Sequence, residues 1–233
     1  MNGQTNYSNI MLNQIEKIWT NWQLNSEPCS ECPDNDTKNY WYPLFGLGNW
    51  NADTMVVCDT PAYNIENIEY RYTKNHLTES MIIQDFKTFA EKLLQERLDS
   101  NTNILIKILK SIVLGTNLTV HDLYFTNIKK CGNISRVQNH EAYAMCFKNF
   151  LIELEVVKPK NIILVGGKAF NMLNNLFKFT DETSVMELFK IPTIFNSHGY
   201  KILVVPHWGY YRRLGKIKEY AKKLNKLSRR FVC

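Results

Sequence analysis

The sequence predicts an α/β fold, a three-layer α/β/α sandwich built on a central, mostly parallel four-stranded sheet. Along the 233 residues, short apolar runs of strand length alternate with longer stretches whose apolar side chains recur at helical period. This alternation is typical of parallel sheets that are covered by helices on both faces. The hydrophobic content of 45% argues against a disordered chain, and the length fits one domain, which we expect to span residues 1–233.

Four short apolar runs predict the strands, at residues 54–58, 120–127, 161–167 and 201–206. Ligands of parallel sheets bind beyond the carboxyl ends of the strands. We therefore expect the chemistry of the protein among the four segments that follow the strands, which are residues 58–66, 127–131, 166–168 and 207–213.

Helices are predicted between and around these strands, at residues 7–24, 79–98, 139–156 and 168–177. The first helix and the polar loop after it form an N-terminal segment of the domain over about residues 7–38. A basic helix at about residues 213–230 ends the domain.

The positive charge of the chain is concentrated in this C-terminal segment. The net charge is +6, yet the residues from Lys201 onward carry +9 and those before it sum to −3. A basic face beside a nearly neutral body favours a polyanionic partner. The alternative is a solvated amphipathic helix, with Leu224, Leu227 and Phe231 as its apolar stripe.

Four of the six cysteines are candidate metal ligands. Cys29 and Cys32 form a C-x2-C pair, a spacing that lets two thiolates of one turn bind one metal centre. With Cys131 and Cys146 they could ligate a tetrahedral zinc ion or a [4Fe–4S] cluster. Reduced cysteines without a metal are the third interpretation.

The compartment is expected to be the cytoplasm. The N-terminus lacks the basic start and apolar run of a signal peptide, and no stretch approaches the roughly 18 apolar residues of a membrane helix. Thiols stay reduced in the cytoplasm. We therefore expect Cys58 to be a core residue and Cys233 to be incidental.

Three short motifs lie in the first half of the chain. They are Cys-Ser-Glu-Cys-Pro at 29–33, Gly-Leu-Gly-Asn-Trp-Asn-Ala-Asp at 46–53, and Cys-Asp-Thr-Pro-Ala at 58–62. Four more follow in the second half. They are Thr-Asn-Ile-Lys-Lys-Cys at 126–131, the pair Glu141 and Cys146, the run from Pro159 to Ala169, and His-Trp-Gly-Tyr-Tyr-Arg-Arg at 207–213.

In their order and spacing these motifs resemble those of the family 4 uracil-DNA glycosylases, over roughly residues 10–215. The resemblance implies a [4Fe–4S] cluster on Cys29, Cys32, Cys131 and Cys146. Three stretches depart from the family: Gly-Glu-Ala-Pro-Gly has become Cys-Asp-Thr-Pro-Ala, the Pro-Phe-Val-Gly stretch that should follow it is not recognisable, and His-Pro has become His-Trp. Because these changes fall in pocket motifs, they favour an altered choice of substrate.

The resemblance also implies roles for individual residues. Asn127 would read the edge of a pyrimidine base and Tyr72 would stack on it. His207 would stabilise the departing base, and Asp59 would orient water or stabilise the positive sugar, with Glu66 as a second candidate carboxylate. The plain structural interpretations are a turn-forming Asn127, a core Tyr72 and a buried structural His207.

The aromatic and basic residues after His207 are expected to contact DNA: Trp208, Tyr210, Tyr211, Arg212 and Arg213. The implied function is a monomeric DNA glycosylase, without a membrane partner, that flips uracil or a modified pyrimidine out of DNA and hydrolyses its N-glycosidic bond. The product would be an abasic site. Two alternatives are a glycosylase for bulky modified bases in anti-phage defence and a non-catalytic DNA-binding or damage-sensing protein.

Overall fold

The computed structural model describes residue 32 and residues 46–59, 104–130, 140–191 and 193–232. These residues belong to two compact units. The first contains Cys32, Gly46, residues 127–130 and residues 140–157, and the second contains the other described residues. The helices predicted at 7–24 and 79–98 lie outside the described residues.

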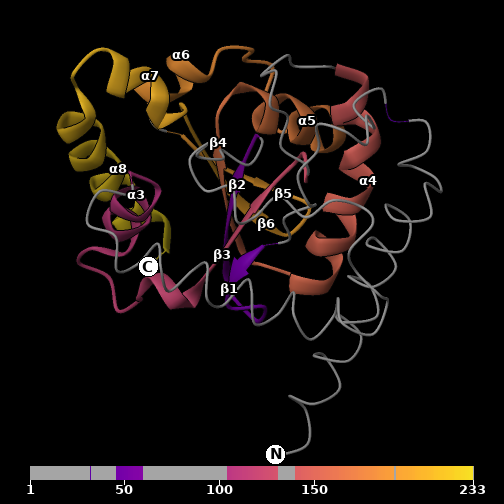
Figure 1. Ribbon diagram of the computed structural model, residues 1–233, viewed down its shortest axis with the longest axis horizontal. Coiled ribbons are helices and arrows are strands. Elements are labelled where there is room, and N and C mark those ends of the chain that lie inside the picture. Colours follow the sequence, from indigo (N-terminus) through magenta and orange to yellow (C-terminus); the bar gives the residue numbers. More distant parts are fainter. Residues whose placement is uncertain (1–31, 33–45, 60–103, 131–139, 192, 233) are drawn as a thin grey trace, which may run out of the picture. The chain divides into compact units, whose positions relative to one another are not determined.

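The second unit is organised around a six-stranded mixed sheet (Figure 1), which corrects the predicted four-stranded sheet. The strand order is β1-β3-β2-β4-β6-β5. The strands are β1 (Leu47–Gly48), β2 (Thr54–Cys58), β3 (Leu123–Asn127), β4 (Asn161–Val165), β5 (Ile194–Ser197) and β6 (Tyr200–Val205). The four predicted strands are present, and β1 and β5 are the additional ones.

The two additional strands lie at the edges of the sheet and run antiparallel to their neighbours, β1 to β3 and β5 to β6. Neither forms a buried apolar run, because β1 has two residues and β5 alternates exposed and half-buried side chains. His198 and Gly199 join β5 to β6, with φ angles of 52° and 83°. This left-handed pair makes a tight hairpin turn that matches the twist of the two strands.

The centre of the sheet is parallel and sets the position of the candidate site. β4 pairs with β2 on one side and with β6 on the other, so that Cys58, Val165 and Val205 end in register. Asp59, Gly166 and Pro206, the residues that follow, therefore leave the sheet at the same edge.

The described helices are α3 (Ile104–Val113), the 3-10 helix η2 (Val120–Asp122), α4 (His140–Val157), α5 (Gly167–Phe177), α6 (Val185–Lys190), α7 (Trp208–Arg213) and α8 (Ile217–Val232). Helices predicted at 139–156 and 168–177 are confirmed as α4 and α5. The C-terminal helix predicted at about 213–230 is present as α8, but it begins four residues later, because Gly215 has a φ of 68° and separates it from the short helix α7. None of the helices in these ranges is long and apolar enough to cross a membrane.

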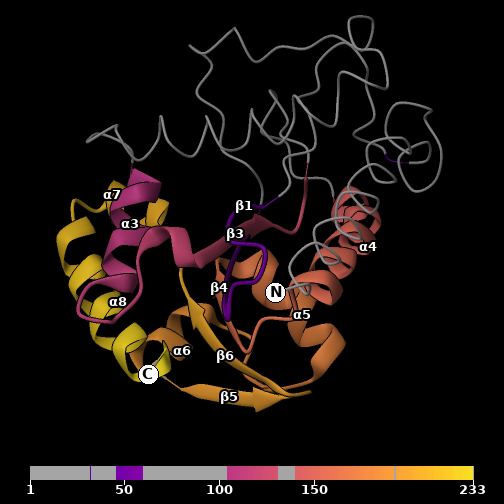
Figure 2. The same cartoon turned by 90° about the horizontal axis from the view of Figure 1, so that it is seen from below.

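Within the second unit, α3 and α8 lie on one face of the sheet and α5 on the other (Figures 1 and 2). Alternate strand residues supply the two faces. Val56 and Cys58 belong to the core that includes α3 and α8, whereas Met55 and Val57 point to the opposite side. All four are at most 2% exposed, so both faces of the central strands are covered.

Helix α8 carries the predicted apolar stripe on its inner side. Leu224, Leu227 and Phe231 are buried, and Asn225 donates from its side chain to the carbonyl groups of Ser111 and Leu114 at the end of α3. Arg229 also donates to the Leu114 carbonyl, which suits the negative end of the α3 dipole. The outer side of α8 is basic and exposed, at Lys218, Lys222, Lys226, Arg229 and Arg230.

Candidate functional site

Asp59 follows β2 and is bound to the amino end of α5. Its Oδ1 atom accepts a hydrogen bond of 2.8 Å from the backbone N–H of Ala169. Gly166 makes this approach possible, because a Cβ atom there would lie 2.7 Å from Asp59 Oδ2 and its φ is +99°. The carboxylate therefore occupies the positive end of α5, where negative charge is stabilised.

The ionisation of Asp59 is nevertheless shifted toward the neutral form. Burial raises its pKa from the ordinary value of 3.8 to about 6, against the lowering effects of the Ala169 N–H and the Lys168 charge. At neutral pH the group is mainly a carboxylate. It would gain a proton at a mildly acidic pH, so this carboxyl can exchange a proton near physiological conditions.

His207 follows β6 and caps the amino end of α7. Its Nδ1 atom accepts a hydrogen bond of 3.0 Å from the backbone N–H of Gly209. Burial, and then the positive charge of Arg213, lower the pKa of His207. The ring is therefore neutral at pH 7 and, because Nδ1 is an acceptor, its proton lies on Nε2. His207 can donate a hydrogen bond through Nε2.

Neighbouring aromatic residues fix the position of His207. Its ring stacks on Trp208 with a centroid distance of 4.3 Å, and Trp208 is only 8% exposed. The hydroxyl of Tyr220, a buried residue of α8, donates to the Pro206 carbonyl at 2.9 Å. The turn that carries His207 is thus held by the core, which keeps the imidazole in one orientation.

The predicted DNA-contacting residues divide into buried and exposed ones. Trp208 belongs to the core and is 8% exposed, and Tyr211 is half-buried against Phe189 and Tyr220. The exposed ones are Tyr210, Arg212 and Arg213. Leu214, which the sequence reasoning missed, is 51% exposed beside them.

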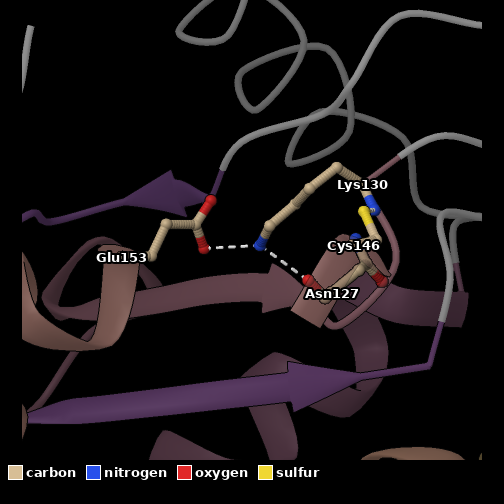
Figure 3. Close-up of polar contacts among 4 residues, drawn as sticks. All are labelled: Asn127, Lys130, Cys146 and Glu153. Carbon is tan, nitrogen blue, oxygen red and sulfur yellow. Dashed lines mark hydrogen bonds and ion pairs between the residues drawn. The ribbon is translucent and has the colours of Figure 1, made fainter. Parts of the chain in front are cut away.

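Asn127 belongs to the first unit and ends β3 in a buried position, 4% exposed. Its main-chain carbonyl accepts a hydrogen bond of 2.6 Å from Lys130 Nζ, and the same ammonium forms an ion pair of 2.7 Å with Glu153 (Figure 3). The turn after β3 is therefore held against α4. Sequence reasoning missed Lys130, although a lysine between Asn127 and Cys131 in one motif was a visible signal.

Two of the four predicted cluster ligands lie in the described residues. Cys146 Sγ accepts a hydrogen bond of 3.0 Å from the backbone N–H of Lys130, the residue that precedes Cys131 in the sequence. Burial raises the pKa of Cys146, and the nearby Cys32 raises it further, whereas Lys130 acts in the opposite direction. Cys32 and Cys146 are thus close enough to interact.

This arrangement fits a thiolate metal centre in its donor chemistry. An N–H group that donates to a cysteine sulfur stabilises the thiolate form and tunes iron–sulfur clusters. Cys29 and Cys131 lie outside the described residues, as do Tyr72 and Glu66. Among the described residues, no group of three or more His, Cys, Asp or Glu side chains is placed to hold a metal ion.

Cys58 is buried in the core, as its place in an apolar strand predicted.

Comparison with known protein families identifies the superfamily of the chain. The sequence profile described as the uracil DNA glycosylase superfamily matches residues 45–227, a span that contains Asp59, Asn127 and His207. No curated protein matches the sequence. The matched span covers most of the chain and all strands of the sheet, and the chain therefore belongs to the uracil DNA glycosylase superfamily.

Proposed function

We propose that the protein is a DNA glycosylase that flips uracil or a modified pyrimidine out of DNA and hydrolyses its N-glycosidic bond. Membership of the superfamily supports the reaction class. The observation that carries the proposal is the geometry of His207, a neutral imidazole whose Nδ1 atom is engaged by Gly209. Its Nε2–H is left to donate to the oxygen of a departing base.

The proposed chemistry separates two charges. Cleavage of the glycosidic bond leaves negative charge on the base and positive charge on the sugar. A hydrogen bond from His207 to the base strengthens as that negative charge develops, and a donor of this kind contributes about 3–4 kcal/mol. A neutral donor suits this step because it remains protonated on Nε2 across the neutral pH range.

Asp59 is proposed to act on the sugar side. It leaves the sheet at the same edge as His207, and at neutral pH its carboxylate is ionised. Negative charge there would stabilise an oxocarbenium-like sugar or orient the attacking water. Because Ala169 and Gly166 fix the carboxylate, it would need no rearrangement during the reaction.

Recognition of the base is proposed to rest on Asn127, with Tyr72 stacking on the base. An amide offers both a donor and an acceptor, which is the pattern a pyrimidine edge requires. The burial of Asn127 and its fixed main chain favour this role, since a reading group must be held in one position.

Contacts to DNA are proposed from Tyr210, Arg212 and Arg213, the exposed side chains that follow His207. Arginines can hold phosphates beside the flipped nucleotide. Leu214 offers an exposed apolar side chain next to them, of the kind that inserts between base steps.

We also propose, on the resemblance to family 4, that Cys29, Cys32, Cys131 and Cys146 hold a [4Fe–4S] cluster with a structural role. The hydrogen bond to Cys146 Sγ supports a thiolate at that position. Purified protein should be brown and contain iron and sulfide. A colourless sample with stoichiometric zinc would reject the cluster, but it would not contradict the proposed glycosylase reaction.

The test of the function is a base-release assay with variants of His207. These variants separate its role as the acceptor that caps α7 from its proposed role as the donor to the departing base. Single- and double-stranded oligonucleotides would carry uracil, hypoxanthine, hydroxymethyluracil or glucosylated hydroxymethylcytosine, and alkali would cleave abasic sites. His207→Asp keeps an acceptor for the Gly209 N–H, because Asp is a good helix cap, but has no proton to donate at pH 7. His207→Asn keeps both an acceptor and a donor.

We expect His207→Asp to lose about 10²–10³-fold of the release rate and His207→Asn to lose less. His121→Ala is the matched control, since His121 is exposed in η2 and outside the proposed machinery. Equal activity of wild type and His207→Asp would refute the role of His207. Tight DNA binding without release of any base would instead favour the non-catalytic sensor.

A further inference from the structure

Lys130 is a fully buried lysine with an unusual set of partners. Its side chain is 0% exposed, and its ammonium donates to the Asn127 carbonyl at 2.6 Å and to Glu153 Oε2 at 2.7 Å (Figure 3). The same nitrogen lies 5.5 Å from the ring centroid of Phe150. Removing an ammonium from water is expensive, and an apolar pair of similar size often stabilises a fold equally well. A role beyond stability would account for the charge.

Lys130 binds α4 at two points with two different groups. Its backbone N–H donates to Cys146 Sγ at 3.0 Å, and its side chain reaches Glu153, seven residues further along α4. Seven residues are about two helical turns, so Cys146 and Glu153 lie on the same face of the helix. The segment from Asn127 to Lys130 is therefore tied along α4 at both of its ends.

Lys130 donates to the main-chain carbonyl of Asn127, and the orientation of this carbonyl determines the backbone conformation of Asn127. The peptide group between Asn127 and Ile128 is planar, so fixing its oxygen fixes the ψ angle of Asn127. With the strand β3 holding the other side of the residue, the Cα–Cβ bond of Asn127 is confined to one direction. An amide that must match the edge of a base depends on such confinement.

We infer that Lys130 is a positioning residue, which, together with Glu153, holds the main chain of Asn127 so that its amide can read the base. This inference rests on the proposed function, since it assigns the purpose of the ion pair to base recognition. It predicts that Lys130 acts through Asn127 and not through the general stability of the fold.

The test replaces the pair together, because a single substitution would leave one buried charge without its partner. Lys130→Met with Glu153→Met keeps the size of both side chains and removes both charges. Glu187→Met with Lys190→Met is the matched control, an exposed pair on α6 with an N–O distance of 2.6 Å. The midpoint of urea unfolding shows whether each variant is folded, and the iron content shows whether it carries as much iron as wild type.

The first readout is single-turnover base release, with a uracil oligonucleotide or the base that wild type releases fastest, in wild-type and Asn127→Ala backgrounds. We expect the buried double substitution to slow release by about 10-fold or more in the wild-type background and by less than about 2-fold in Asn127→Ala, because residues that act as a unit are not additive. Equal slowing in both backgrounds, or none in a folded, loaded protein, would overturn the inference.

The second readout does not depend on activity. Amide hydrogen exchange of peptides covering 123–130 should speed up in the buried double variant while peptides of α8 are unchanged. Unchanged protection of 123–130 would overturn the inference even if the protein is a glycosylase. If wild type releases no base, the proposed function fails, and the purpose assigned to the Lys130–Glu153 pair fails with it. The exchange data would still show whether Lys130 holds residues 127–130 in place.

Discussion

Replacing Asp59 by Asn removes a negative charge from a partly buried position while keeping the size of the side chain. The amide oxygen of Asn can still accept the hydrogen bond from Ala169 N–H that Asp59 Oδ1 accepts at 2.8 Å. Burial is the main reason why the pKa of Asp59 rises from 3.8 to about 6, so the folded protein disfavours the charged form. Removing the charge should therefore stabilise the fold at every pH above about 4, and the gain should reach its full size above pH 6.

The size of this effect follows from the two pKa values. A shift from 3.8 to about 6 is roughly two units, and each unit corresponds to about 1.4 kcal/mol, which gives a gain of about 3 kcal/mol at pH 7.5. The native state binds more protons than the unfolded state between these values, so wild-type stability falls as pH rises through this window. At pH 5 the advantage of Asp59→Asn should be about half as large.

Urea unfolding of wild type and Asp59→Asn at pH 5 and pH 7.5 measures both numbers, and base release measures the chemical role. We expect the variant to be more stable and slower by about 10²-fold, as for a lost catalytic carboxylate. Asp59→Ala is the comparison that also removes the acceptor for Ala169 N–H. A variant Asp59→Asn that is less stable than wild type at pH 7.5 would refute the reasoning, because the charge would then be what holds α5.

Further predictions concern the turn, the histidine, the cluster and the DNA surface. Gly166→Ala should destabilise the fold by about 1–3 kcal/mol in urea unfolding, because the residue has a φ of +99° and its Cβ would meet Asp59; wild-type stability would contradict this. Base release should stay nearly constant from pH 8 to 7 and fall below about 6.5, because Asp59 gains its proton near pH 6 and because burial and Arg213 hold the pKa of His207 below its ordinary 6.5; a fall centred above pH 7 would argue against the neutral donor. Cys146→Ser should lower the iron content measured by absorption and elemental analysis, and full iron loading would exclude this ligand. Replacing Arg212 and Arg213 by Gln should reduce the slope of log affinity against log salt by up to about 2 in a DNA titration, and an unchanged slope would remove both residues from the interface.

The parallel core of the sheet could be predicted from the sequence because its strands are continuous apolar runs. The run at 161–167 is the clearest example: β4 occupies residues 161–165 and is buried along its whole length, since helices cover both faces. The apolar stripe on the inner side of α8 could be predicted for a related reason, because Leu224, Leu227 and Phe231 recur at helical period. All three are buried in the structure.

The edge strands and the short helices carried no such signal. β1 has two residues, and β5 exposes half of its side chains, so neither shows a continuous apolar run. The turn at His198 and Gly199 was the available clue to β5, because a residue followed by Gly between two extended segments is typical of a hairpin.

The sequence by itself determined the superfamily and the residues proposed to carry the chemistry, because a superfamily motif is a local pattern. Only the tertiary structure decided what each residue can do. Trp208 is buried and supports His207, which no local pattern distinguishes from an exposed aromatic residue. Likewise, the ionisation of Asp59 and the partners of Lys130 depend on burial and on contacts made far along the chain, with Ala169 and with Glu153. Burial and long-range contacts exist only in the folded chain, and they set the charge and direction of each group.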